Sequence, residues 1–360
     1  MIPGKLHAWL ASAAMLGMSA LLDAAAIRPR AAVVPTLSGG LNQMGPVGSS
    51  TYPRANFLSD GSLIGAYTAR EDDGAEMIIT IAHSTDAGVT WTEIGTVDRG
   101  PSATTDKDNP YPFQLPSGRV LVAFRNHDRT APTAWTYYRI TICYSDDNGA
   151  TWQYLSTPAE ESNSATGVWE PFFRLAADGE TLQLYYSREN NASDQDSLMR
   201  TSADGGLTWS APTVLSGAEL PSSRDGMLGV AEVSGPGDLI AVFETEMAGS
   251  SFHIASVRSP DDGATWGDRR DVYIPATGSA AAPQVINVGG TLVVSFQSTE
   301  GGNDNTMYVV TSGDGGETWD NKIVVMEPTS LWAGLLTLDD TNFLGMADHD
   351  GAKTQKVLLS

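Results

Sequence analysis

The glutamate at position 170 is the residue of this sequence whose surroundings best suit a chemical role. It stands in the segment Val168-Trp-Glu-Pro-Phe-Phe173, where aromatic side chains flank it on both sides. Removing a carboxyl group from water raises its pKa, and a raised pKa suits an acid that donates a proton near neutral pH. The alternative is structural: Glu170 pairs with Arg54 or Arg125 and joins two neighbouring units of the fold.

A second acidic position follows the apolar run Leu239-Ile-Ala-Val-Phe243, which leads into Glu244 and, two residues later, Glu246. Residues two apart on a strand share a face, so one carboxylate can react while the other orients it. Glu244 is favoured because it follows the aromatic residue directly. Two carboxylates across a cleft can hydrolyse a glycosidic bond, with retention at about 5 to 5.5 Å separation and inversion at about 6.5 to 9.5 Å.

Further polar and aromatic residues stand where innermost strands are expected to start and second strands to end. We expect these residues to bind a substrate, the aromatic ones by stacking on the apolar faces of a sugar. They are Arg54, Tyr111, Arg125, His127, Trp169, Asp225, Gln284 and Trp332. His127 and His349 match no carboxylate–histidine ligand spacing, so neither a metal nor another cofactor is expected.

The elements that position these residues are marked by an eight-residue phrase, Ser-x-Asp-x-Gly-x-Thr-Trp. It occurs five times, as Ser84–Trp91, Ser145–Trp152, Ser202–Trp209, Ser259–Trp266 and Ser312–Trp319. Repetition at a nearly constant spacing indicates a repeat architecture. The Asp can accept backbone hydrogen bonds, the Gly allows an unusual conformation and the Trp buries apolar surface, so the phrase predicts a hairpin turn. A calcium loop is disfavoured because the phrase supplies too few oxygen ligands.

Three further segments with strand chemistry recur six times around the turn phrases, each rich in β-branched and aromatic residues. This pattern predicts an all-β fold, a six-bladed β-propeller of four-stranded antiparallel blades. The last unit lacks its fourth strand, and we expect Ala31 to Leu37 to supply it and close the ring. The turn phrases should then lie on the face opposite the starts of the innermost strands.

The first residues differ from the rest of the chain. Lys5 and His7 precede an apolar run from Ala8 to Leu22, and Ala24-Ala25-Ala26 offers a small-residue cleavage site. These features are typical of a secretory signal peptide. We therefore divide the chain into a signal peptide, residues 1–26, and one propeller domain, residues 31–360, and expect a secreted, extracellular protein.

Charge limits the partners of the protein. The 360 residues include 43 acidic and 21 basic side chains, for a formal net charge of −22. Such a charge repels nucleic-acid phosphates and anionic lipid, so we expect no nucleic-acid or membrane partner and a neutral or cationic one instead. The single cysteine, Cys143, allows no internal disulfide and lies in an apolar run, where cysteine is usually a small buried hydrophobe.

The turn phrases and strand order resemble those of the sialidase-like superfamily of Asp-box (BNR) propellers, over about residues 45 to 360. A sialidase would carry three arginines that clamp a substrate carboxylate and a tyrosine nucleophile in the last unit. Arg54, in Tyr52-Pro-Arg-Ala55, takes the place of the first arginine. No arginine follows Arg270, the fifth unit offers Gln284, and the sixth has Trp332 in place of tyrosine, so a sugar acid would lose its charge-assisted contacts.

The chain is more similar to the fungal exo-α-1,5-L-arabinanases of glycoside hydrolase family 93. The likeness lies in Tyr52 to Tyr67, Val168 to Phe173 and Phe243 to Glu246. It implies a retaining enzyme that releases arabinobiose from a chain end of arabinan, a neutral plant cell-wall polysaccharide. We expect the protein to be a monomer. Glu170 and either Glu244 or Glu246 would be the catalytic pair, with Glu170 favoured as the acid/base. A sialidase and a non-catalytic carbohydrate-binding propeller are the alternatives.

Overall fold

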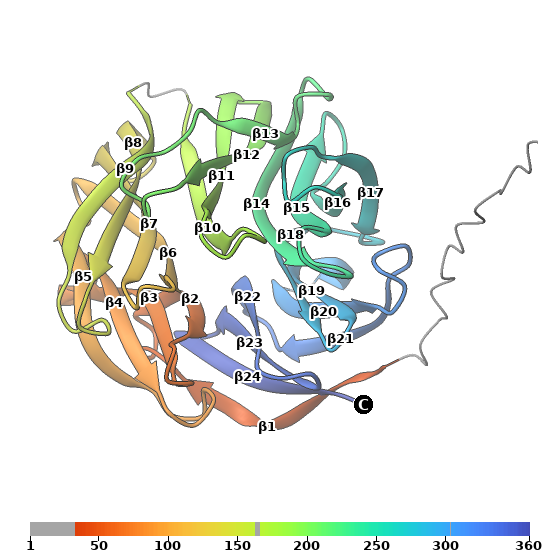
Figure 1. The fold of residues 1–360 in the computed structure, drawn as a ribbon, viewed down its shortest axis with the longest axis horizontal. Coiled ribbons are helices and arrows are strands. Elements are labelled where there is room, and N and C mark those ends of the chain that lie inside the picture. Colours follow the sequence, from red (N-terminus) through yellow and green to blue (C-terminus); the bar gives the residue numbers. More distant parts are fainter. Residues whose placement is uncertain (1–32, 163–165, 303) are drawn as a thin grey trace, which may run out of the picture.

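The computed structural model describes residues 33–162, 166–302 and 304–360, and these residues form a ring of antiparallel β-sheets around a central axis (Figure 1). Two short 3-10 turns, η1 (Asp72–Gly74) and η2 (Glu300–Gly302), follow strands at the rim. In the same three ranges, no helix has the length and apolar content needed to cross a membrane. The predicted all-β propeller is confirmed. The predicted signal peptide, residues 1–26, lies outside the described residues.

Four of the sheets have four strands each. The first two contain β2 (Ser50–Phe57), β3 (Leu63–Glu71), β4 (Glu76–Ser84) and β5 (Thr92–Pro101), then β6 (Thr105–Gln114), β7 (Val120–Ala131), β8 (Ala134–Ser145) and β9 (Gln153–Glu161). The other two contain β18 (Ala280–Val288), β19 (Thr291–Ser298), β20 (Thr306–Ser312) and β21 (Asp320–Met326), then β22 (Leu331–Thr337), β23 (Asn342–Asp348), β24 (Ala352–Leu359) and β1 (Pro35–Gln43).

The remaining strands form one eight-stranded sheet, which corrects the prediction of six separate blades. It contains β10 (Val168–Leu175), β11 (Leu182–Asn191), β12 (Asp194–Ser202), β13 (Thr213–Ser216), β14 (Ser223–Glu232), β15 (Leu239–Met247), β16 (His253–Ser259) and β17 (Gly267–Tyr273). The two halves are joined by a single parallel pair, Gln195 with Arg224. This pair forms because β13 has only four residues and covers β12 only from Ser197 onward. The Arg224 side chain also donates to Gln195 Oε1 at 2.9 Å.

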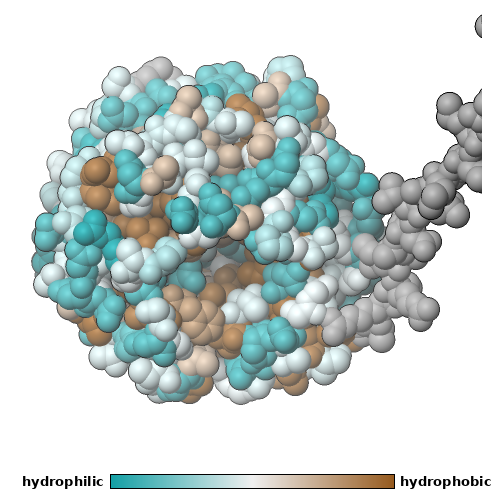
Figure 2. Space-filling view, in the orientation of Figure 1, coloured by the Kyte–Doolittle hydropathy of each residue, from teal (hydrophilic) through white to brown (hydrophobic). Residues whose placement is uncertain are grey.

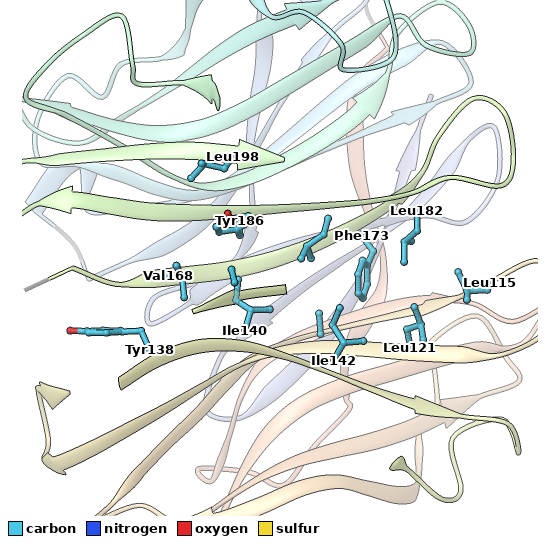
Figure 3. Close-up of a cluster of buried hydrophobic side chains, with 13 residues drawn as sticks. Leu115, Leu121, Tyr138, Ile140, Ile142, Val168, Phe173, Leu182, Tyr186 and Leu198 are labelled. Carbon is cyan, nitrogen blue, oxygen red and sulfur yellow. The ribbon is translucent and has the colours of Figure 1, made fainter. Parts of the chain in front are cut away.

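Neighbouring sheets pack face to face through alternating apolar side chains. Figure 3 shows one such interface, where Ile140 and Ile142 of β8 lie opposite Val168 and Phe173 of β10. Tyr186 of the next strand belongs to the same buried cluster. Burial of this kind stabilises a ring without any disulfide, and the one cysteine, Cys143, is buried and free as expected.

The five turn phrases are structural, as predicted. In the first, Asp86 Oδ1 accepts the Thr90 N–H at 2.8 Å, Ser84 Oγ accepts the Gly88 N–H at 2.9 Å, and Trp91 Nε1 donates to the Gly88 carbonyl at 3.1 Å. The same three bonds recur at Asp147, Asp204 and Asp261. At Asp314 the Asp and Ser bonds recur, but Trp319 Nε1 has no partner among the described residues. Since each carboxylate is satisfied by its own turn, none is available for a substrate on the opposite face.

The ring is closed by the N-terminal strand, as predicted. β1 pairs antiparallel with β24, from Pro35 opposite Leu359 to Gln43 opposite Lys353. The closing strand begins later than the predicted Ala31 to Leu37 and continues to Gln43; residues 31 and 32 lie outside the described residues.

Removing β1 should therefore open the ring. We expect a chain that starts at Met44 to melt well below a control chain that starts at Val33, because β24 would become an unpaired edge. Thermal unfolding followed by circular dichroism would measure the difference. Equal melting temperatures for the two truncations would show that β1 does not stabilise the ring.

Candidate active site

Each of the six innermost strands breaks its ladder near the axis. In β2, β6, β10, β14, β18 and β22 the register with the second strand shifts, and one residue at the shift has a positive φ. These residues are Tyr52 (52°), Asn109 (55°), Glu170 (47°), Met227 (51°), Ala282 (53°) and Trp332 (59°). Positive φ is uncommon for such residues and tends to occur where function requires it.

A pocket lies on the axis beside these bulges, and its walls come from five innermost strands. It is a small pocket, lined by Tyr52, Arg54, Asn109, Pro110, Tyr111, Glu170, Pro171, Met227, Leu228, Pro283 and Gln284. A second cavity shares Tyr111 and Gln284 with it and has mainly apolar walls. Figure 2 shows one face of the ring, which is hollowed near its centre.

Glu170 is the acidic side chain in the wall of this pocket. Its carboxyl is half-buried, and its Oε2 atom is enclosed with no hydrogen-bond partner among the described residues. Burial raises the pKa of Glu170 to about 8, the charge of Glu244 raises it too, and the charge of Arg125 opposes the rise. The raised pKa predicted from the aromatic surroundings is therefore confirmed.

Glu244 belongs to the same site. It lies on β15 between the buried residues Phe243 and Thr245, and its Oε2 accepts the N–H of Ala282 at 2.7 Å. Burial raises the pKa of Glu244 above its usual value; the Ala282 N–H and the charge of Arg224 offset part of the rise, and the charge of Glu246 adds to it. Since Glu244 is the carboxylate whose charge acts on Glu170, the structure favours Glu244 over Glu246 as the partner.

Arg125 approaches Glu170 without pairing with it. Its Nη2 lies 3.1 Å from Asp108 Oδ2 and 3.4 Å from Asp106, and its guanidinium carbon stands 5.4 Å from the centre of the Trp169 ring. Within the described part of the chain, no ion pair joins Glu170 to Arg125 or Arg54. The structural alternative for Glu170, an ion pair between neighbouring units, is therefore not observed.

Arg54 is buried in the pocket wall and connects the first and last innermost strands. Its Nη1 donates to the carbonyls of Pro53 and Trp332, both at 2.8 Å. A Cβ on Gly334 would come within 2.8 Å of the same nitrogen, so a glycine there makes room for the guanidinium. Arg54 reaches the pocket as predicted, together with Tyr111 and Gln284.

Other predicted substrate ligands lie in the walls around the site. His127 is buried, its Nε2 bonds the Val168 carbonyl at 2.9 Å, and burial together with the charge of Arg125 lowers its pKa well below the usual range. Trp169 packs edge-on against His127 with ring centres 4.9 Å apart. Both side chains thus support the strand that carries Glu170, and neither lines the pocket.

Asp225 and Trp332 are also occupied by the protein itself. Asp225 is fully buried, lies 2.6 Å from Arg269 Nη1 and accepts the Thr245 hydroxyl at 2.7 Å. Trp332 stacks on Tyr52 with ring centres 4.4 Å apart. The structure therefore places Asp225 in an ion pair away from the pocket and Trp332 behind Tyr52.

Several residues of the site were missed from the sequence. Tyr52 and Met227 line the pocket, and Asp108 holds Arg125. A signal was present, because proline follows four of the six bulge residues, in Tyr52-Pro, Asn109-Pro, Glu170-Pro and Ala282-Pro. A recurring X-Pro at the start of a strand favours an irregular backbone there.

Comparison with known proteins agrees with this architecture. The family model described as a BNR repeat-like domain matches residues 153–333, and the chain belongs to this family. The predicted resemblance to the Asp-box (BNR) propellers is thereby confirmed.

Individual relatives are glycosidases. A sialidase of Clostridium perfringens is 27% identical over 255 residues, which cover 63% of this chain and 61% of the sialidase, so the chain spans less than two thirds of that relative. The GH93 α-L-arabinofuranosidase of Fusarium graminearum, solved with arabinobiose, has a TM-score of 0.68 at 24% identity over 88% of this chain and 96% of that one. The Penicillium chrysogenum α-L-arabinanase, also solved with arabinobiose, has a TM-score of 0.66 at 20% identity. The match covers 91% of this chain and 98% of that one. The two solved structures share the propeller fold with this chain.

The electrostatic coupling of the two acids can be tested directly. Replacing Glu244 with Gln removes a negative charge beside Glu170, so we expect the pKa of Glu170 to fall below about 8. Carbon-13 NMR titration of glutamate-labelled protein would measure it, with the Glu170 signal assigned by its loss in Glu170→Gln. Glu246→Gln is the matched control and should leave that pKa unchanged. An unchanged titration in Glu244→Gln would place the two acids in separate sites.

Proposed function

We propose that the protein is a secreted, retaining glycoside hydrolase that cleaves α-1,5-L-arabinan from a chain end and releases arabinobiose. The observation that carries the proposal is that the charge of Glu244 acts on Glu170 at the axial site, and that Glu244 accepts a backbone N–H while Glu170 Oε2 has no partner among the described residues. The Fusarium and Penicillium structures, which share the fold, contain arabinobiose.

The two environments assign the roles of the acids. Glu170, with a pKa of about 8, carries a proton near neutral pH and is the general acid. Glu244 accepts the Ala282 N–H, which opposes the effect of burial on its pKa, and it is assigned as the nucleophile because Glu170 has the stronger case for the general acid.

In the first step, Glu244 bonds to the anomeric carbon as the glycosidic bond breaks, and the proton of Glu170 goes to the departing oxygen. In the second step, the Glu170 carboxylate takes a proton from water, whose oxygen bonds to the anomeric carbon and releases Glu244. Two displacements at the same carbon retain its configuration.

A neutral substrate fits the charges of the site. The positive charge of Arg125 is shared between Asp106 and Asp108, and the protein carries a net charge of −22. One buried guanidinium, Arg54, remains in the pocket wall, where it binds two backbone carbonyls. A sugar hydroxyl can accept from such a group without bringing a second charge into the site.

Sialidase activity is the second candidate, and two observations favour it. The Clostridium perfringens sialidase is similar over 255 residues, and Arg54 lines the pocket. The position expected to provide a further arginine holds Gln284, which is why arabinan is ranked first.

Glu170→Gln should retain arabinan binding and lose hydrolysis, by about 10²- to 10⁴-fold, because the leaving oxygen would no longer receive a proton. Product release from linear arabinan would measure the loss, and proton NMR of the first product would give its anomeric configuration. Glu246→Gln is the control and should stay active. Full turnover by Glu170→Gln would exclude the mechanism, and release of sialic acid from a chromogenic sialoside would favour the second candidate.

We also infer six blades, with the third and fourth joined by the Gln195–Arg224 pair. The bulge occurs once in each of six innermost strands, and β10–β13 and β14–β17 are each antiparallel groups of four.

We further infer a secreted monomer from which residues 1–26 are removed. After expression in a secreting host, we expect to find the protein in the culture medium, with an N-terminus directly after Ala26 by N-terminal sequencing. Light scattering should give the mass of a single chain in solution. Protein retained in the cell with Met1 intact would contradict secretion.

A further inference from the structure

The hairpin between β11 and β12 carries a motif that the proposed hydrolysis does not use. Its tip reads Asn191-Ala192-Ser193, and Asn191 pairs with Asp194 across the turn. Asparagine followed two residues later by serine or threonine, with no proline between them, is the acceptor sequence for N-linked glycosylation. This sequence occurs once in the 360 residues, so the chain offers a single acceptor.

The carboxamide of Asn191 is presented to solvent in a fixed orientation. Asn191, Ala192 and Ser193 are all exposed. Asn191 Oδ1 accepts the backbone N–H and the hydroxyl of Ser193, both at 2.9 Å. Because a backbone N–H can only donate, the oxygen must face Ser193 and the Nδ2 atom must point away from it. Among the residues that the structure describes, Nδ2 has no hydrogen-bond partner, so the atom that would carry a sugar is free.

The preceding residue, Asn190, differs in the use of its carboxamide. Its Nδ2 donates to Asp196 Oδ2 at 2.8 Å and to Asp194 Oδ2 at 3.3 Å. Asn190 is also exposed, but the residue two positions later is Ala192, which has no hydroxyl. Exposure therefore does not separate the two neighbouring asparagines, whereas the motif and the free nitrogen do, and Asn190 is a matched control for Asn191.

The hairpin tip lies at the opposite end of its blade from the Asp turn. Ser202, which begins the third turn phrase, pairs with Leu182 at the other end of the β11–β12 ladder. The Arg224 side chain of β14 donates to the Ala192 carbonyl at 3.0 Å, which holds the tip against the next strand group. Asn191 does not line the axial pocket, so a group attached to its Nδ2 replaces no contact of that pocket.

We propose that Asn191 is an N-glycosylation site, which receives its glycan from a lipid-linked oligosaccharide diphosphate in a secretory pathway that holds an oligosaccharyltransferase. The inference rests on the proposed secretion of the protein. In the transfer, Asn191 Nδ2 bonds to the anomeric carbon of the first sugar, and the bond from that carbon to the diphosphate oxygen breaks. The lipid diphosphate leaves with the electron pair of that bond, and Nδ2 loses one proton to a base of the transferase.

The test expresses residues 27–360 behind the secretion leader of a eukaryotic host, so that it does not depend on the native first 26 residues. Protein is collected from the medium and from the cell membranes, which keeps the measurement valid for a variant that folds poorly. Treatment with peptide N-glycosidase should lower the mass of the chain. In water labelled with oxygen-18, the same treatment should convert the Asn191 carboxamide to a labelled carboxylate, which peptide mass spectrometry would locate.

Four variants locate the acceptor. Asn191→Gln and Ser193→Ala should lose the glycan, because each removes one part of the motif, whereas Ser193→Thr and the control Asn190→Gln should keep it. An Asn191 peptide without label in the unsubstituted chain, or a glycan retained in Ser193→Ala, would overturn the proposal. The mass measurement needs no substrate. A glycosylated chain that does not hydrolyse arabinan would therefore refute the proposed hydrolase alone, and an active chain without glycan would refute this inference alone.

Discussion

The site depends on a break in hydrogen bonding that each innermost strand makes near the axis. A regular strand sends its side chains alternately towards its two neighbouring sheets. The bulge gives one residue a positive φ and frees an N–H that the ladder would otherwise use. Such a conformation costs about 1 to 3 kcal/mol per residue, which the surrounding packing must offset. The Tyr52–Trp332 stack and the buried cluster of Tyr52, Met227 and Ala282 supply part of this packing.

The bulge also explains how one ring gives two glutamates different chemistry. Glu170 is itself a bulge residue, and its Oε2 has no partner among the residues that the structure describes, so burial dominates. Glu244 stands on a second strand and receives an N–H that the next bulge has freed. The positive charge of Arg125 favours the ionised form of Glu170, but Arg125 forms ion pairs with Asp106 and Asp108, which reduce this effect. The two glutamates therefore differ in hydrogen bonding because one is a bulge residue of an innermost strand and the other lies on a second strand.

The repeats made the ring, its closure by the N-terminal strand and the role of the Asp turns predictable. Glu170 was predictable because its aromatic neighbours are adjacent in sequence. The pairing of β12 with β14, which joins two blades into one sheet, was not predictable from the sequence. It depends on how much of β12 is paired with the short strand β13. Asp225 and His127 were predicted to bind a substrate, but Asp225 forms an ion pair and His127 bonds a backbone carbonyl. Sequence alone does not distinguish these uses of a polar residue at a strand end. Asp108 was missed because its contact with Arg125 comes from the pairing of neighbouring strands and not from local sequence.

Ring closure has a kinetic consequence. The β1–β24 ladder joins residues more than 300 positions apart, as in the Thr36–Leu358 contact, and such contacts form slowly because chain entropy opposes them. The Arg54–Trp332 hydrogen bond in the pocket wall spans 278 positions. The nearest-neighbour contacts of the middle sheets can form earlier, and the pocket becomes complete only when the two ends of the chain meet. An intermediate with most of its sheets in place would therefore still lack a finished site.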